Sequence, residues 1–340
     1  MLSVIKSPHT VATRNPTMKN TTPFLFGIAL ACLPHPAAAA AAYPSRPIRI
    51  VDAFPPGGPS DLVARTINQK LSESLGQTVV VDNRGGASGV LGCDLVAKAT
   101  PDGYTLLIGP SGALTIQPTL NPKLPYNPQR DFVTITQLTN GPQIIAVHPS
   151  VAAKSVQELI ALARAKPGQL NYASGGGGTA NHIAVEAMKL AAGVNIVHVP
   201  YKGTGPALTG VLTGEAQMII ASLLAALPHA RSGKLRALAV TTAARSAALP
   251  DVPTASESGL PKFETSSWHG MLAPAKTPRA IVTKLHAEFV KVMNQSDVKE
   301  RLNSQGLDVV ASTPEQFAAH IRAETEKYAR VIKQIGLKAE

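Results

Sequence analysis

The sequence is poor in cysteine and in aromatic residues. It holds two cysteines, and Cys32 lies in an N-terminal segment that we expect to be removed, so Cys93 has no partner for an internal disulfide. Aromatic residues make up 4% of the chain, with a single tryptophan. The formal net charge is +11, yet the basic residues are scattered. Because nucleic-acid binding favours a basic stripe with stacking aromatics, we expect no nucleic-acid partner and favour anionic small molecules.

The sequence also lacks the short motifs of common catalytic sites. It contains no GxSxG, HExxH or CxxC pattern. His182 and Glu186 are one helical turn apart and could share a metal ion, but a metal site needs more than two protein ligands. Asp61 is placed where a capping residue is more usual than a catalytic base. We therefore expect a protein that is not an enzyme and that has no cofactor and no metal site.

The first 42 residues are typical of a secretory signal peptide. They hold Lys6, Arg14 and Lys19 but no acidic residue, followed by an apolar run over 24–33 and by alanines up to residue 42. The apolar run is too short for a permanent membrane span, and small residues before Tyr43 suit a signal peptidase. We predict cleavage before Tyr43 and a periplasmic mature protein.

Two features of this N-terminal segment leave alternatives open. A complete signal peptide could also begin at Met18, in which case residues 1–17 are an over-extended translation start. The segment Leu30-Ala31-Cys32 faintly resembles a lipoprotein cleavage box, although Ala29 stands where leucine is expected. Lipid anchoring at Cys32 is therefore an alternative to release of the mature protein.

Strand patterns and helix patterns alternate along the rest of the chain. The first series is a strand, helix, strand, helix and strand at 48–53, 60–75, 78–82, 90–99 and 104–109. Two β-rich runs follow, at 133–136 and 144–147, and then a second series begins. Such alternation predicts βαβ units and a mostly parallel sheet. We predict an α/β fold of two domains joined by two crossings near residues 140 and 267, with domain I at 43–140 plus 268–340 and domain II at 141–267.

A glycine-rich junction links a strand to a helix at residues 170–186, LNYASGGGGTANHIAVE. Thr179 or Asn181 can cap a helix that begins at His182. The first N–H groups of a helix lack intrahelical partners and lie at the positive end of its dipole, so the junction indicates an anion site. The alternative is a loop in which glycine only supplies a positive φ. A similar junction at 48–65, IRIVDAFPPGGPSDLVAR, with a cap at Ser60-Asp61, suggests a second wall of one cleft.

Seven segments after the signal peptide carry a family resemblance. They are FPPGGPSDLVAR, VVVDNRGGASG, ATPDGYTLLIG, SGGGGTANHIAVEAM, HVPYKGTGPALTGVLTGE, GKLRALAVTTAAR and WHGMLAPAKTP. In order and spacing they resemble the Bug family of periplasmic solute receptors, the receptor component of tripartite tricarboxylate transporters. The resemblance implies a monomeric two-domain protein of the Venus flytrap (periplasmic-binding-protein) type that holds a small carboxylate and delivers it to membrane subunits of such a transporter. An alternative is a periplasmic carboxylate-sensing protein that signals to a sensor kinase.

The resemblance also implies which loops hold the ligand. The expected ligand-binding residues are Phe54, Gly57, Gly58, Ser60, Asp61, Ser111, Ala113, Ser174, Gly176, Gly178, Thr179 and His182. Neither glycine-rich loop contains Lys or Arg, so we expect backbone N–H groups and hydroxyls to hold the carboxylate. Ala221 stands where many relatives carry an acidic or polar residue, which disfavours an amino-acid ligand. Trp268 either borders the cleft or is a core tryptophan.

Overall fold

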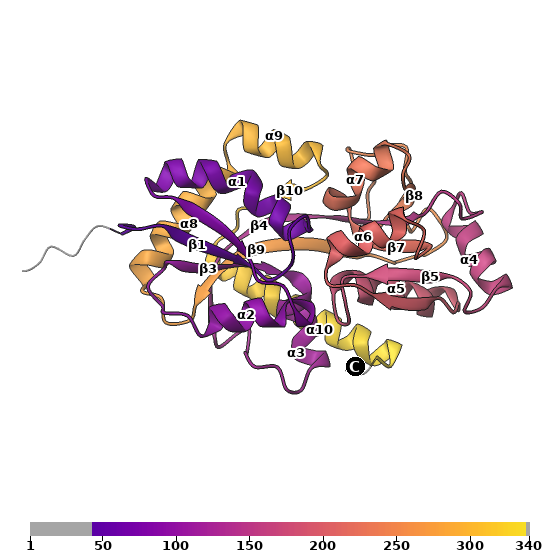
Figure 1. Ribbon diagram of the computed structural model, residues 1–340, viewed down its shortest axis with the longest axis horizontal. Coiled ribbons are helices and arrows are strands. Elements are labelled where there is room, and N and C mark those ends of the chain that lie inside the picture. Colours follow the sequence, from indigo (N-terminus) through magenta and orange to yellow (C-terminus); the bar gives the residue numbers. More distant parts are fainter. Residues whose placement is uncertain (1–42, 338–340) are drawn as a thin grey trace, which may run out of the picture. The chain divides into compact units, whose positions relative to one another are not determined.

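The fold is built on a mixed β-sheet with helices packed on both of its faces (Figure 1). The computed structural model describes residues 43–337, which belong to one compact unit of residues 41–340. The predicted signal peptide, including Cys32, lies outside the described residues. Within 43–337, no helix is long and apolar enough to cross a membrane.

In the described part of the chain, ten strands make up the sheet. Eight of them follow the order β2-β1-β3-β9-β4-β7-β5-β6, while β8 and β10 each pair with β4. The strands are β1 (Ile48–Asp52), β2 (Val79–Asn83), β3 (Thr105–Pro110), β4 (Phe132–Val147), β5 (Asn171–Ser174), β6 (Val197–Pro200), β7 (Met218–Ser222), β8 (Arg236–Val240), β9 (Ser266–Pro274) and β10 (Asp308–Val309). Parallel pairs join β1 to β2 and β3, and β5 to β6 and β7, as expected for βαβ units. Every pair made by β4 or β9 is antiparallel, so the sheet is mixed and the prediction of a mostly parallel sheet is wrong.

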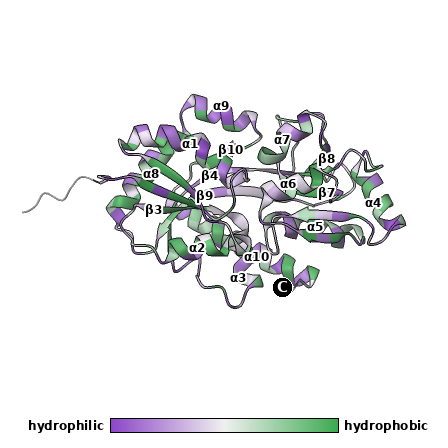
Figure 2. Cartoon of the chain, viewed as in Figure 1, coloured by the Kyte–Doolittle hydropathy of each residue, from purple (hydrophilic) through white to green (hydrophobic). Residues whose placement is uncertain are grey.

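The helices are α1 (Pro59–Leu75), α2 (Val90–Ala97), α3 (Gln117–Leu120), α4 (Val156–Ala165), α5 (Ala180–Ala192), α6 (Thr204–Leu212), α7 (Leu223–Arg231), α8 (Arg279–Met293), α9 (Ser296–Ser304) and α10 (Pro314–Ile335). Two short helical turns, η1 (Ala87–Gly89) and η2 (Gly112–Ile116), precede α2 and α3. Figure 2 shows α9 largely in hydrophilic colours, in keeping with a helix that buries only Val298 and Leu302.

Successive residues of β1 point to opposite faces of the sheet, so they pack in two different hydrophobic clusters. Ile48 and Ile50 of β1 pack in the cluster formed by α1 and α8, whereas Val51 packs with residues of α2 and α10. On α1 the buried residues Ile67 and Leu71 follow the spacing of one helical face, as predicted. Burial of side chains of this size stabilises the fold by roughly 1.5–3 kcal/mol each.

The helix starts in the two glycine-rich junctions agree only in part with the predicted caps. Helix α1 begins at Pro59 with Gly58 in the N-cap position, so Ser60 and Asp61 are not caps. Helix α5 begins at Ala180 rather than His182, and Thr179 occupies its N-cap position without making a side-chain capping bond. The side chains of Ser60, Asp61 and Thr179 instead make hydrogen bonds within the loops.

The long strand β4 connects the two series. It pairs with β9 up to Pro142 and with β7 from Gln143 onward, so the two predicted β-rich runs are parts of one strand. Strand β9 begins at Ser266, where the chain returns to the first series. These are the places where the sequence predicted two crossings, and the division into domains at 43–140 plus 268–340 and 141–267 stays a prediction.

Candidate functional site

A cavity of about 50 Å³ lies where several helices begin and where strands β3, β4, β7 and β9 meet them. Its walls come from the starts of α1, α5, α6 and η2 and from one face of the strands. The lining residues are Phe54, Gly58, Pro59, Ser60, Pro110, Ser111, Gly112, Gln143, Thr179, Ala180, Asn181, Thr204, Ser222, Ser267, Trp268 and His269. None of these lining residues is Asp, Glu, Lys or Arg, so the cavity is polar without a formal charge.

Four buried polar atoms of the lining residues have no hydrogen-bond partner in the protein. They are Gln143 Oε1, Asn181 Nδ2, Ser222 Oγ and Trp268 Nε1. Buried polar groups are nearly always hydrogen-bonded, and leaving one unpaired costs about 1–3 kcal/mol. Four such atoms around one small cavity therefore indicate a site that binds a polar ligand.

The side-chain amide of Asn181 is held in one orientation. Its Oδ1 accepts a hydrogen bond from the backbone N–H of Gly175 at 3.3 Å and another from the hydroxyl of Thr179 at 2.6 Å. Because a backbone N–H needs an acceptor, the amide oxygen must face Gly175. Asn181 Nδ2 is thereby left as a free donor at the cavity.

Thr179 acts through Asn181 rather than as a free donor. Its hydroxyl has the Gly176 carbonyl oxygen at 2.7 Å and Asn181 Oδ1 at 2.6 Å, and both of these atoms are acceptors. A hydroxyl carries a single proton, so no donor remains for a ligand while these contacts persist. Thr179 is therefore a positioning residue in this structure.

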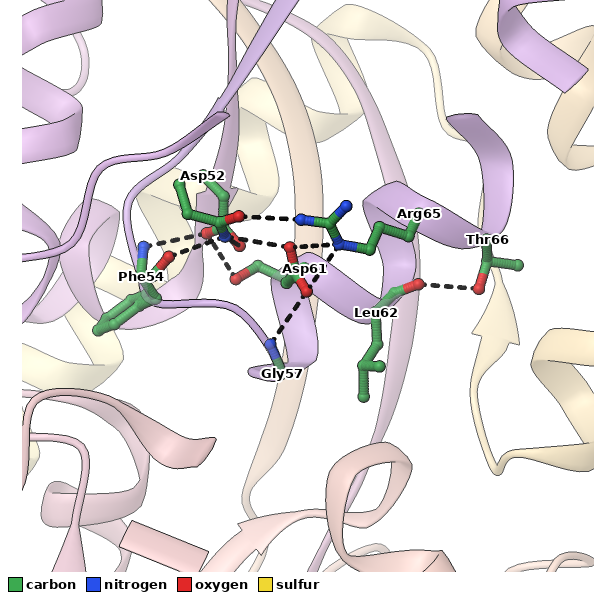
Figure 3. A network of polar contacts seen from close by, with 9 residues as sticks. Asp52, Phe54, Gly57, Asp61, Leu62, Arg65 and Thr66 are labelled. Carbon is green, nitrogen blue, oxygen red and sulfur yellow. Dashed lines mark hydrogen bonds and ion pairs between the residues drawn. The ribbon is translucent and has the colours of Figure 1, made fainter. Parts of the chain in front are cut away.

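The loop between β1 and α1 is fixed by buried carboxylates (Figure 3). Asp52 Oδ1 accepts from the Ser60 hydroxyl at 2.8 Å and from the Phe54 N–H at 3.1 Å. Asp61 accepts from the Gly57 N–H at 3.0 Å and from Arg65 Nε at 2.9 Å. These bonds hold the turn that brings Phe54 and Ser60 to the cavity.

The two carboxyl groups differ in their protonation. Burial raises the pKa of Asp52 to about 7, although the hydrogen bonds from Ser60 and Phe54 oppose the shift. Burial also acts to raise the pKa of Asp61, but hydrogen bonds from Arg65, Gly57 and Asn83 outweigh it and leave that pKa below its usual value. Asp61 is therefore an ionised structural anchor, and Asp52 titrates near neutrality.

Five of the twelve predicted ligand-binding residues line the cavity: Phe54, Gly58, Ser60, Ser111 and Thr179. Gly57 and Asp61 instead bond to each other, and Ala113 is buried in the core beside α2. Ser174 contacts His198 Nε2 at 2.5 Å, and Gly176 lies against Ser88. Gly178 and His182 line a neighbouring cavity of about 260 Å³. The assignment of these residues to ligand binding stays a prediction.

His182 is a neutral structural residue. Its Nδ1 accepts from the Gly178 N–H at 3.0 Å, and its ring stacks on His198 with centroids 4.1 Å apart. Burial, followed by the nearby His198, lowers the pKa of His182 to about 4. It therefore supplies no positive charge to a bound anion near neutral pH. Within residues 43–337, no group of three His, Cys, Asp or Glu residues could hold a metal ion.

The structure adds polar lining residues that the sequence did not indicate as ligand-binding, namely Gln143, Asn181, Thr204, Ser222, Ser267 and His269. Asn181 carried a signal, because it lies in the first turn after the glycine run. Ala221 is buried in the core, and the residue of β7 that reaches the cavity is its neighbour Ser222. Ala221 therefore says nothing about the ligand directly. Trp268 is both fully buried and cavity-lining, so its two interpretations are compatible.

Comparisons with known proteins agree with this architecture. The model of the tripartite tricarboxylate transporter family receptor matches residues 63–337. The UPF0065 protein in the tcbD-tcbE intergenic region of Pseudomonas sp. (strain P51) is 41% identical, with 88% of this chain and 89% of that protein covered. BugT of Bordetella pertussis is 38% identical, with 87% of this chain and 91% of BugT covered.

Three solved structures are similar over nearly the whole of their chains. The periplasmic binding protein BugD is 33% identical with a TM-score of 0.85, and 88% of this chain and 100% of that chain are covered. An R. palustris protein solved with adipate is 34% identical with a TM-score of 0.86 and the same coverage. MatC from Rhodopseudomonas palustris, solved with bound malate, is 34% identical with a TM-score of 0.82, covering 85% of this chain and 100% of its own. The predicted α/β fold of the periplasmic-binding-protein type is confirmed.

Proposed function

The chain belongs to the tripartite tricarboxylate transporter receptor family, whose members are solute-binding receptors rather than enzymes, and we propose that it binds a small carboxylate in the cavity between α1 and α5. The observation that carries the proposal is the pair of unpartnered donors Asn181 Nδ2 and Trp268 Nε1 at that cavity. Both groups can only donate, and an ionised carboxylate can only accept. The adipate and malate bound by similar proteins belong to the same chemical class.

Electrostatics favour an anion that carries no ammonium group. The starts of α1, α5 and α6 line the cavity, and each contributes unpaired N–H groups and the positive end of a helix dipole. No lining residue is acidic, so an ammonium group would meet no counter-charge. These features support mono- or dicarboxylates over amino acids.

The size of the cavity implies that ligand entry requires movement. A volume of about 50 Å³ has room for only a few water molecules, since about 10–15 Å³ of such space is needed to hold one. A dicarboxylate is several times larger than water, so the loops that close over the cavity must separate to admit it. We propose a hinge motion carried by β4 and β9, the strands that connect the two series.

We also propose that the mature protein acts in the periplasm and delivers its ligand to the membrane subunits of a tripartite tricarboxylate transporter. The proposal is supported by the family match and by the signal-peptide pattern of residues 1–42. Intact-mass measurement of protein from the periplasmic fraction tests the location, with a start at Tyr43 expected. A lipidated N-terminus at Cys32 would replace the soluble receptor with a tethered one.

Thermal-shift screening of the mature protein tests carboxylate binding. Mono-, di- and tricarboxylates are compared with neutral sugars and amino acids of similar size. A ligand that binds only the native state stabilises by about 2.7 kcal/mol at a hundredfold excess over Kd, so a clear rise in Tm is expected with a carboxylate. A rise with a neutral sugar and none with any carboxylate would refute the proposal.

A further inference from the structure

Asp52 is a buried acidic residue that has no role in the carboxylate site proposed above. It ends β1, is completely inaccessible to solvent, and lies directly behind the cavity wall formed by Phe54 and Ser60. Three donors reach its carboxyl group: the Ser60 hydroxyl, the Phe54 N–H and, at 3.2 Å, Asn83 Nδ2. All three donors are neutral.

The charged and titratable groups that face Asp52 do not neutralise it. Asp61 and Arg65 lie on α1, and Arg65 Nε donates to Asp61 rather than to Asp52. Cys93 approaches from α2, and burial raises its pKa to about 12, which keeps the thiol neutral. Burial likewise raises the pKa of Asp52 to about 7, so this acid is ready to take up a proton near neutral pH.

The Ser60 hydroxyl connects Asp52 to the ligand site. Ser60 lines the cavity and donates its only proton to Asp52 Oδ1 at 2.8 Å. While Asp52 is ionised, that proton is therefore held away from the cavity, and Ser60 presents only an oxygen lone pair there. A carboxylate that arrived at the cavity would meet this lone pair and, behind it, a second negative charge.

We propose that binding of a carboxylate is coupled to uptake of one proton by Asp52, which turns the Ser60 hydroxyl toward the ligand. The proton comes from solvent and binds Asp52 Oδ1, which then donates to Ser60 Oγ while still accepting from the Phe54 N–H. Ser60 in turn donates its own proton to the ligand carboxylate. The coupling rests on the proposed carboxylate-binding function and adds a protonation step to it.

The direction of the pH effect follows from linkage. A bound anion raises the pKa of Asp52 further, because it adds a like charge and withdraws the Ser60 hydrogen bond. Above about pH 7 the free protein must gain a proton to bind, so Kd rises by up to tenfold for each pH unit. Below about pH 6 Asp52 is already protonated, so its titration no longer affects the affinity.

Titration calorimetry with malate and with adipate tests the coupling. At pH 8 the apparent binding enthalpy is measured in buffers of different ionisation enthalpy, and the slope gives the number of protons taken up. We expect close to one proton per ligand at pH 8 and close to none at pH 5.5. This count needs no variant, so it holds even if a change at Asp52 impairs folding.

Two substitutions assign the proton to its site. Asp52→Asn should abolish the uptake and make Kd independent of pH between 6 and 9. Asp94→Asn, on α2 in an ion pair with Lys98 outside the cavity, removes one carboxylate as well and should keep the uptake. Uptake that persists in Asp52→Asn would overturn the assignment.

The failures of the two proposals are distinguishable. Carboxylate binding with no proton uptake at pH 8 and with a pH-independent Kd refutes the coupling and leaves the receptor function intact. If no carboxylate in the thermal-shift screen raises the Tm at either pH 8 or pH 5.5, the proposed function itself is wrong and the coupling falls with it.

Discussion

Replacing Asn181 with aspartate is the sharpest test of the cavity as a carboxylate site. The change keeps the shape of the side chain and keeps Oδ1 as the acceptor for the Gly175 N–H and the Thr179 hydroxyl. It replaces the free donor Nδ2 with a carboxylate oxygen. Aspartate is also favourable in the first turn of a helix, so we expect the melting temperature of the unliganded protein to change little.

The loss of affinity can be worked out in two ways. If both carboxylates stay ionised about 4 Å apart, their repulsion at an effective dielectric constant near 20 is about 4 kcal/mol. If the new aspartate is protonated instead, raising its ordinary pKa of about 3.9 past pH 7 costs at most about 4 kcal/mol, because burial at position 181 itself raises the pKa. The cheaper path sets the penalty, so Kd at pH 7 should rise by up to about three decades.

Titration calorimetry at pH 7, 6 and 5 checks this result. The wild type should be flat between pH 6 and 5, whereas Asn181→Asp should recover about tenfold because its new carboxyl group becomes easier to protonate. Asn303→Asp on the exposed side of α9 adds the same charge away from the cavity and should bind as the wild type does. Unchanged affinity in Asn181→Asp would show that Nδ2 does not meet the ligand.

Three further changes probe the same cavity. Trp268→Phe keeps an aromatic ring but removes the Nε1 donor, so Kd should rise by one to two decades, and an unchanged Kd in calorimetry would place the ligand elsewhere. Thr179→Val removes the hydrogen bond that holds the amide of Asn181, so the affinity should fall and the free energy of unfolding should fall by about 1 kcal/mol. If neither quantity falls, Thr179 does not position Asn181. Burial lowers the pKa of His269 to about 4, below its value near 6.5 in the unfolded chain. The contribution of neutral His269 to the free energy of unfolding is therefore fully present above pH 6.5 and falls by up to about 1.4 kcal/mol per pH unit toward pH 4. In urea unfolding, His269→Asn should show a weaker dependence of the free energy of unfolding on pH.

Secondary structure was largely predictable because periodicity is a local property. Helix α1 and the alternation of strands and helices follow from apolar spacing that can be read over a dozen residues. The continuity of β4 was not predictable, since Asn140-Gly141-Pro142 has the composition of a turn. In the fold Gly141 serves close packing, because a Cβ there would lie 2.5 Å from a methyl carbon of Leu307. Only tertiary contact distinguishes such a glycine from a turn residue.

The cavity was less predictable because it depends on strand faces and on distant partners. Successive residues of a strand point to opposite faces, so Ser222 faces the cavity whereas Ala221, one position earlier, faces the core. Ser60 looked like a helix cap because its partner Asp52, eight residues earlier, is revealed only by the packing of the loop. Gln143 lies within a long buried strand, where sequence alone gives no reason to expect an unpaired amide. Sequence patterns located the helix starts that line the cavity but not the side chains between them.

The glycine run that indicated an anion site allows the loop after β5 to pack closely against its neighbours. None of Gly175 to Gly178 lines the cavity, whose contribution from this segment begins at Thr179. A Cβ on Gly176 would lie 2.6 Å from Ser88 Oγ, and the Gly177 carbonyl accepts a hydrogen bond from Gln117 Nε2 at 3.0 Å. Glycine is therefore needed so that the loop after β5 can fit against η1 and α3, while the start of α5 supplies the donors. The packing of this loop and the start of α5 that lines the cavity are thus encoded in adjacent residues of one segment.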